Sequence, residues 1–175
     1  NRGGSRYSGR IDNFLASGLL GEIASWGYIV IASNYRENDE FGGDDVNDIM
    51  NLFEIIDDLP EADCNRIGME GWSRGGMMTY RCLSKTDRIK CAVAVSALSN
   101  LERTLSINPE LNKYVTELIK SSGIEKNSFF KSRSAVDFYK SIAKSTPVLF
   151  IHGNSDDKVS HLDSVELFEK LSNEN

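Results

Sequence analysis

The chain has 175 residues and a mass of 19.5 kDa, and 40% of its residues are hydrophobic, so its length predicts one globular domain with a packed core. A net charge of -6 and a pI near 5.0, without a dense block of Lys or Arg, argue against a nucleic-acid surface. No stretch approaches the roughly 18 apolar residues of a membrane span, so no membrane partner is expected. Cys64, Cys82 and Cys91 have no spacing that indicates a disulfide framework or a zinc site. Their use slightly favours a cytoplasmic location but leaves the compartment open.

Short apolar runs alternate along the chain with segments of helical periodicity, a pattern typical of a parallel sheet with helices on both faces. Burial on both faces requires strands that are almost continuously hydrophobic. Four such runs predict strands at residues 28–32, 66–70, 91–95 and 147–151. Apolar positions at helical spacing predict helices at 11–26, 46–56 and 74–82.

Two further features refine this pattern. Asp44 and Asp45 directly precede the second helix, and we expect them to cap it. Residues 99–145 are polar, with weaker helical patterns at 111–119 and 135–142. We interpret this stretch as a helical excursion over the mouth of the sheet, where segments that shape a substrate site often lie, although a plain surface insertion fits equally well.

The most informative motif is Gly-Trp-Ser-Arg-Gly at residues 71–75, directly after the predicted strand at 66–70. A serine between two glycines at this point is the signature of a nucleophile elbow, a sharp strand-to-helix turn that exposes the hydroxyl above a sheet. The motif therefore makes Ser73 the candidate nucleophile of a serine hydrolase.

A serine hydroxyl is a weak nucleophile at neutral pH, so Ser73 needs a histidine base and a carboxylate that orients the base. An acidic loop, residues 152–159, follows the last predicted strand, and sites of open α/β sheets gather at the carboxyl ends of strands. Asp156 lies in the chain order serine, acid, histidine that α/β-hydrolases use, and Asp157 is its competitor.

Residues 66–76 and 150–159 resemble the nucleophile segment and the acid loop of the prolyl oligopeptidase family of serine peptidases. Residues 32–36 and 43–48 resemble an upstream part of its catalytic domain, so the likeness covers almost the whole chain. The resemblance implies an α/β-hydrolase fold, a doubly wound and mostly parallel sheet with helices on both faces. In that family the catalytic acid is the first of the two aspartates, which corresponds to Asp156.

Residues 1–4, Asn-Arg-Gly-Gly, resemble a variant of the His-Gly-Gly loop that lines the oxyanion hole in these hydrolases, with the histidine replaced. The safer oxyanion donor is the backbone N–H of Arg74, because amides at a helix start point at the developing negative charge. The Arg74 side chain is in addition a candidate for binding a carboxylate in the cleft.

The base is harder to place, because the chain contains two histidines. His152 ends a buried strand and is expected to be a hydrogen-bonded structural residue. His161 lies only five residues beyond Asp156, whereas in this fold the base arrives on the loop after one further strand. We therefore expect residues 1–175 to form a partial α/β-hydrolase catalytic domain that lacks the first strands and the last strand, with the catalytic histidine beyond the chain.

The favoured function is a serine peptidase of the prolyl oligopeptidase type, in which Ser73, Asp156 and an unseen histidine cleave a peptide bond without metal or organic cofactor. A carboxylesterase or acyl esterase uses the same triad, which leaves an acyl ester as the alternative substrate. A non-catalytic hydrolase-like binding domain is a third reading. The hydrophobic strand at 147–151 would be an exposed sheet edge, which predicts self-association.

Overall fold

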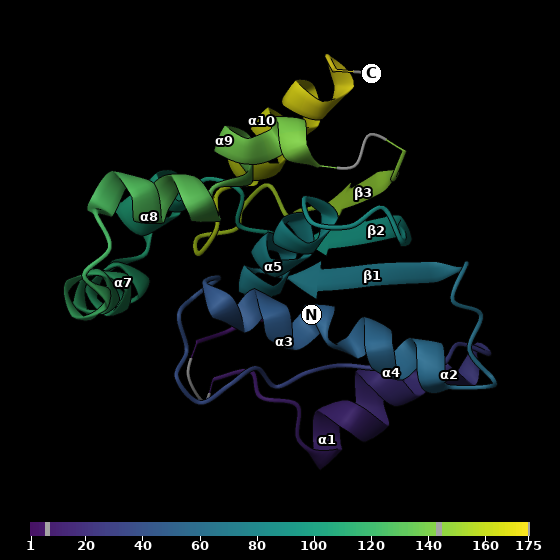
Figure 1. The fold of residues 1–175 in the computed structure, drawn as a ribbon. Helices are drawn as coiled ribbons and strands as arrows, with labels where there is room; N and C mark the ends of the chain where they lie inside the picture. Colours follow the sequence, from purple (N-terminus) through teal and green to yellow (C-terminus); the bar gives the residue numbers. More distant parts are fainter. Residues whose placement is uncertain (6–7, 143–144, 175) are drawn as a thin grey trace.

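The computed structural model describes residues 1–5, 8–142 and 145–174 (Figure 1). Its sheet has three parallel strands in the order β1-β2-β3, with β2 in the centre. The strands are β1 (Ile67–Trp72), β2 (Ile89–Val95) and β3 (Val148–Ile151). Three of the four predicted strands are therefore confirmed, each to within a few residues at either end.

The predicted strand at residues 28–32 is wrong, because this segment is irregular. A strand needs a hydrogen-bonded neighbour as well as apolar side chains. The free edge of β1 is met instead by the first residue of the chain, where the Trp72 N–H donates to the Asn1 carbonyl at 3.4 Å. Tyr28 and Ile29 are exposed. The hydrophobic residues at 28–32 suggest a strand, but hydrophobicity does not indicate whether a neighbouring strand is available for hydrogen bonding.

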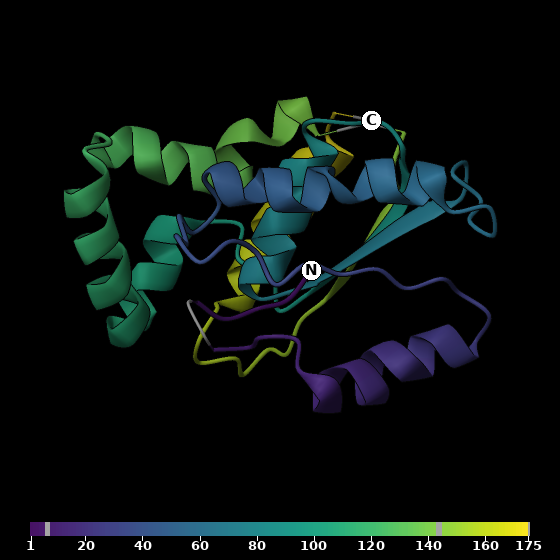
Figure 2. The same cartoon turned by 60° about the horizontal axis from the view of Figure 1, so that its bottom comes forward.

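The predicted helix at 11–26 forms as α1 (Asn13–Leu15), a π-helical segment η1 (Ala16–Leu20) and α2 (Gly21–Ser25). Asp12 caps its start by accepting a hydrogen bond from the Leu15 N–H at 2.9 Å. None of the residues of this segment is buried. Figure 2 shows the segment on the opposite side of the sheet from α3 and α4.

The next helices are a 3₁₀ turn η2 (Asp44–Val46), α3 (Asn47–Met50) and α4 (Leu52–Asp58), which cover the second predicted helix. The expected capping by Asp44 and Asp45 is not observed: Gly43 is the N-cap residue and makes no side-chain cap bond. The Asp45 carboxylate turns back to accept from the Gly42 N–H at 3.0 Å and faces Arg74. This aspartate therefore belongs to an ion-pair network and not to a helix cap.

Helix α5 (Arg74–Leu83) begins directly after β1 and packs on β1 and β2. Nine of its ten residues are buried, which makes it the central helix of the core. The strand register puts Gly71, Ala94 and Phe150 in one row that faces the α5 side, with Ala94 fully buried. Gly71 and Ala94, the small residues of this row, let the helix approach the sheet closely.

Four helices and a 3₁₀ turn follow β2: α6 (Leu101–Ile107), α7 (Pro109–Ser122), α8 (Lys126–Arg133), α9 (Ala135–Phe138) and η3 (Tyr139–Ser141). Both segments of this stretch that the sequence predicts to be helical form helices: α7 covers 111–119, and α9 with η3 covers 135–141. Figure 1 shows α7 and α8 extending to one side of the sheet. Residues 143 and 144 of the predicted excursion lie outside the described residues, and its role at the sheet mouth stays a prediction.

The last helix, α10 (His161–Ser172), begins at its N-cap Ser160 and packs beside β3 and α9. Its buried residue Asp163 accepts hydrogen bonds from the backbone N–H groups of Ser99 and Asn100, at 3.0 and 2.9 Å. This carboxylate fastens α10 to the segment that follows β2. In the part of the chain that the structure describes, no helix combines the length and apolar character that crossing a bilayer requires.

Candidate active site

Ser73 lies between β1 and α5 in a strained backbone conformation, with φ 52° and ψ -118°. A non-glycine residue with positive φ is uncommon, and here the surrounding hydrogen bonds impose it. The Ser73 N–H donates to the Val95 carbonyl at 2.9 Å, and its carbonyl accepts from the Leu98 N–H at 3.2 Å. The predicted turn is thus present, and the serine is the N-cap residue of α5 and not an interior helical residue.

The two glycines of the motif are required by close contacts between backbone atoms. A Cβ at Gly71 would lie 2.2 Å from the Gly75 carbonyl oxygen, and a Cβ at Gly75 would lie 2.1 Å from the Asn1 carbonyl oxygen. Either distance is shorter than atoms tolerate, so a larger residue at either position would force the backbone apart. The sharp turn and the seating of the first residues of the chain both depend on this lack of a side chain.

The surroundings of Ser73 include two groups suited to an oxyanion hole. As the first residue of α5, Arg74 has a backbone N–H with no acceptor in its own helix. The loop formed by residues 1–4 runs along the serine: a Cβ at Gly3 would lie 3.5 Å from the Ser73 Cβ. This arrangement agrees with the likeness of residues 1–4 to an oxyanion loop.

The acid loop holds Asp156 in a fixed orientation. Its Oδ1 accepts from the backbone N–H groups of Lys158 and Val159, at 2.9 and 3.0 Å. Burial acts to raise the pKa of Asp156, but these two bonds, together with a hydrogen bond from Ser96, outweigh it and lower the pKa below its ordinary value. The carboxylate is therefore ionised at neutral pH, as an orienting acid must be.

The competitor, Asp157, has a different environment. Its side chain is 83% exposed, and the Lys158 ammonium lies 3.8 Å away at the surface. A solvated carboxylate of this kind has no fixed direction, since a surface ion pair holds its partners only weakly. The geometry thus favours Asp156 of the two acids.

Ser73 and the acid loop lie at the same end of the sheet, the one formed by the carboxyl ends of its strands. The strands are parallel, and Ser73, Ser96 and His152 directly follow β1, β2 and β3 at their carboxyl ends. Hydrogen bonds connect the three positions, from the Ser73 N–H to the Val95 carbonyl at 2.9 Å and from the Ser96 N–H to the Ile151 carbonyl at 2.8 Å. Sequence analysis did not single out Ser96, whose φ of 43° marks a second strained turn between nucleophile and acid.

His152 is a structural residue in this arrangement, as its position at a strand end predicts. Its side chain is buried, with Nε2 2.9 Å from the Val159 carbonyl and Nδ1 2.7 Å from the Ser164 hydroxyl. A carbonyl can only accept, so Nε2 donates to Val159. Both ring nitrogens have partners within the acid loop and α10, and Nε2 also lies 3.5 Å from Asp156 Oδ2.

His161 is the first residue of α10, at the far end of the acid loop. Among residues 1–5, 8–142 and 145–174, no hydrogen bond or ion pair joins His161 to Asp156 or to Ser73. The structure thus brings the predicted serine and acid together at the carboxyl ends of the strands, and the histidine beside the acid, His152, is held by Val159 and Ser164.

The side chain of Arg74 does not face the cleft as the sequence suggested. It is 2% exposed and forms ion pairs with the buried carboxylates of Asp39 and Asp45. Burial acts to lower the pKa of Arg74, but the two carboxylates raise it on balance. Asp45, which the sequence pattern assigns to a helix cap together with Asp44, is a member of this network instead.

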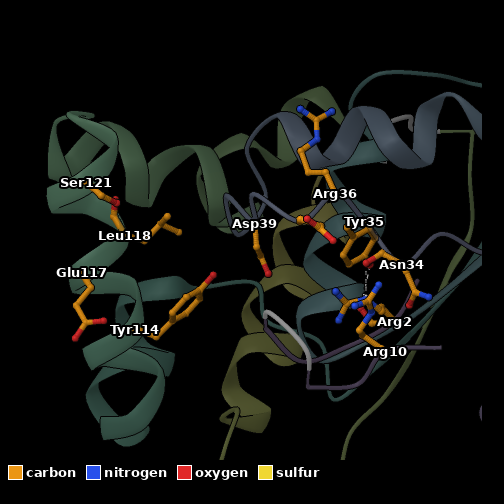
Figure 3. A pocket seen from close by; sticks show the side chains of 11 residues that line it. Arg2, Arg10, Asn34, Tyr35, Arg36, Asp39, Tyr114, Glu117, Leu118 and Ser121 are labelled. Atoms are coloured by element: carbon orange, nitrogen blue, oxygen red, sulfur yellow. Dashed lines mark hydrogen bonds between the residues drawn. The ribbon is translucent and has the colours of Figure 1, made fainter. Parts of the chain in front are cut away.

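A cavity of about 490 Å³ is lined by residues of the start of the chain, of the segment at 34–39 and of α7. Figure 3 shows α7 on one side of it, with Tyr114 and Glu117, and the segment that carries Tyr35 together with Arg2 on the other. Arg2 is the chain neighbour of Gly3, which lies along Ser73, so one residue joins the wall of the cavity to the loop beside the candidate nucleophile. Arginine and glutamate side chains both line it, so its wall carries both signs of charge.

The sequence profile of the Prolyl oligopeptidase family matches residues 20–175. The chain belongs to this family. The family resemblance found at residues 66–76 and 150–159 is thereby confirmed. An uncharacterised peptidase of Bacillus subtilis, YtmA, is 28% identical over 97% of this chain and 66% of its own length.

Solved structures of the same fold confirm the predicted α/β-hydrolase class. The acylaminoacyl peptidase of Pyrococcus horikoshii is 25% identical, with a TM-score of 0.66, over 77% of this chain and 22% of that one. An esterase of Pyrococcus furiosus shares the fold at 22% identity, with a TM-score of 0.67, over 97% of this chain and 65% of that one. The chain thus spans between about a fifth and two thirds of the length of these proteins.

Proposed function

We propose that the chain carries the nucleophile, the acid and one oxyanion donor of a serine peptidase of the prolyl oligopeptidase type. One observation carries this proposal: Ser73 has the backbone geometry of a nucleophile elbow at the sheet edge where Asp156 is fixed and ionised. Membership of the family and the peptidases among its relatives support a peptide as substrate.

In the proposed reaction, the Ser73 hydroxyl attacks the carbonyl carbon of the scissile peptide bond while a histidine takes its proton. The negative charge that develops on the carbonyl oxygen is stabilised by the Arg74 N–H, a contribution of about 3 kcal/mol in comparable sites. The histidine then protonates the leaving amine, and water releases the acyl group from Ser73. Asp156 orients the imidazole and stabilises its positive charge.

We infer that the base is neither of the two histidines described. Nδ1 of His152 lies 2.7 Å from the Ser164 hydroxyl, and among the residues that the structure describes no hydrogen bond or ion pair joins His161 to Asp156. The segment of 175 residues by itself should therefore react with a fluorophosphonate far more slowly than the complete gene product, because loss of a triad member lowers turnover by about 10⁴ to 10⁶. Equal reaction rates for the two would contradict this inference.

The experiment that tests the function compares Ser73→Ala and Asp156→Ala with the unaltered complete gene product on a chromogenic peptide amide. Both substitutions should abolish most of the activity, and Asp157→Ala, the matched control in the same loop, should retain it. Full activity of Ser73→Ala would refute the proposal. Loss of activity in Asp157→Ala alone would transfer the role of the acid to the neighbouring residue.

An acyl ester remains the alternative substrate, since the same groups cleave esters and amides. The ratio of kcat/KM for a peptide amide to that for a nitrophenyl ester of the same acyl group separates the two activities. A measurable amide rate that Ser73→Ala abolishes supports the peptidase, and hydrolysis of the ester alone supports the esterase. A complete gene product that cleaves neither would support a non-catalytic binding domain.

We also propose that residues 1–175, as an isolated segment, self-associate through β3. This strand pairs with β2 and lies at the edge of the described sheet, with Leu149 and Ile151 exposed. Unpaired backbone groups beside apolar side chains are a template for another strand. Leu149→Lys should lower the sedimentation coefficient of a concentrated sample if the proposal holds, and a monomer at all concentrations before substitution would contradict it.

A further inference from the structure

Arg74 is unusual among the buried residues because its guanidinium lies between two buried carboxylates. Its Nη1 lies 2.5 Å from Asp39 Oδ2, and its Nη2 contacts Asp45 Oδ2. A buried charge is costly unless it is paired, and here the guanidinium is paired with both of these carboxylates. The planar fork of an arginine suits this arrangement, since one group donates in two directions.

The same guanidinium has a third contact, which reaches the candidate oxyanion loop. Its Nη1 donates to the Gly4 carbonyl at 3.2 Å, a link across 70 residues of sequence. Gly4 has a φ of +73°, and the adjoining Gly3 lies along Ser73. The residue after the nucleophile therefore holds, with its side chain, the loop that faces the nucleophile.

Tyr35 completes the connection between Arg74 and the loop. Its ring centroid lies 4.7 Å from the guanidinium of Arg2 and 5.0 Å from that of Arg74, and its hydroxyl donates to the Arg2 carbonyl at 3.0 Å. Burial raises the pKa of Tyr35, so the hydroxyl keeps its proton and remains a donor. Figure 3 shows the ring beside Arg2 at the wall of the cavity.

We propose that the Arg74 side chain, held by Asp39 and Asp45, is a positioning residue that fixes the Gly3–Gly4 loop over Ser73. The inference rests on the proposed serine hydrolase function. The backbone N–H of Arg74 would donate to the oxyanion, and its side chain would set the opposite wall of the same hole. A displacement of about 1 Å in such a wall lowers turnover by about 100-fold without altering how the ground state binds.

The test uses the complete gene product with three substitutions, Arg74→Met, Arg74→Lys and Tyr35→Phe. Active sites are counted by burst titration, so that kcat is expressed per functional Ser73 and a partly unfolded sample does not lower it. The matched control is Arg103→Met, which removes another arginine that bridges two acids, Asp163 and Glu166, away from the loop. Each variant is also tested for its rate of inactivation by a fluorophosphonate.

We expect kcat per active site to fall about 100-fold in Arg74→Met, with KM changed less than about threefold, and the inactivation rate to fall in parallel. Arg74→Lys should recover only part of kcat, because a single ammonium does not reproduce the fork. Tyr35→Phe, which keeps the ring and loses one hydrogen bond, should fold and lower kcat several-fold. Arg103→Met should lower thermal stability and leave kcat per active site unchanged.

An unchanged kcat per active site in Tyr35→Phe and in whichever Arg74 variant folds would overturn the positioning role and leave only a structural one. A change confined to KM would overturn it as well. Failure of the proposed function itself is recognised separately, because Ser73→Ala would then keep its activity. The two failures therefore give different results in the same assay.

Discussion

The two faces of the sheet differ sharply. On the face under α5, Ala92 and Ala94 are 2% and 0% exposed, and Gly71 is in contact with the helix backbone. On the other face, Trp72 and Ile151, which lie in one row across the strands, are 49% and 48% exposed. The same three strands thus have one face with the packing of a protein core and one face open to solvent.

This difference shows which contacts hold the residues of the candidate site in position. The turn at Ser73, the start of α5 and the anchor of α10 are all fixed from the packed face, through contacts that leave no room for a larger side chain. The open face exposes apolar side chains such as Trp72 and Ile151. Substitutions on the two faces should therefore have different consequences.

Gly71→Ala should have the largest effect on stability, because the added methyl would meet backbone atoms of Gly75 that cannot move independently. We expect a loss of about 3 kcal/mol or more, at the upper end for overpacking. Gly18→Ala is the matched control, since nothing lies within 4 Å of its Cβ, and it should be neutral or slightly stabilising. Chemical denaturation monitored by circular dichroism measures both. Equal losses of stability in the two variants would contradict the prediction that the turn at Gly71 is more tightly packed than the exposed helix at Gly18.

Asp163→Ala should have the next largest effect, a decrease of about 3 kcal/mol in the free energy of unfolding. The substitution leaves the backbone N–H groups of Ser99 and Asn100 buried without their acceptor and frees one end of α10. The exposed Asp157→Ala should change the free energy of unfolding by less than about 0.5 kcal/mol. Denaturant unfolding of the two variants under identical conditions distinguishes them, and a small loss in Asp163→Ala would contradict the anchoring role.

Adjacent residues of β3 allow the sharpest comparison of the two faces. Phe150 packs edge-on against Phe168 of α10, with ring centroids 6.2 Å apart, whereas Leu149 points to the open side and is 56% exposed. Phe150→Ala should cost about 3 kcal/mol and Leu149→Ala less than about 1 kcal/mol. Thermal unfolding measures the difference. A larger cost for Leu149→Ala would show that the open face is covered in solution.

The smallest expected effect is the pH dependence contributed by Asp156. Its pKa in the folded protein is lowered, so the group stabilises the fold above its unfolded pKa, and this stabilisation is lost as the pH falls through the folded value. The difference in unfolding free energy between the unaltered protein and Asp156→Asn should be constant from pH 7 to about 5 and diminish below about 4. Urea unfolding across this range measures it, and a difference that grows toward low pH would contradict the direction.

Much of this architecture could be predicted from the sequence because it depends on local pattern. The strands predicted at 66–70, 91–95 and 147–151 contain short apolar stretches between segments of helical pattern, and Ser73 and Asp156 follow strand ends in a recognisable order. The segment at 28–32 has the same hydrophobicity but no partner, and partners are a property of the folded sheet. The network of Arg74 could not be predicted either, since its contacts to Gly4 and Asp45 join residues that lie 70 and 29 positions away.

The most direct test of the account is the site of covalent labelling by a fluorophosphonate in the complete gene product. Peptide mapping by mass spectrometry should find the label on Ser73, the labelling should disappear in Ser73→Ala, and Asp156→Ala should slow it by at least about 100-fold. Label on a different serine, or an unchanged labelling rate in Asp156→Ala, would contradict the pairing of this nucleophile with this acid at the edge of the sheet.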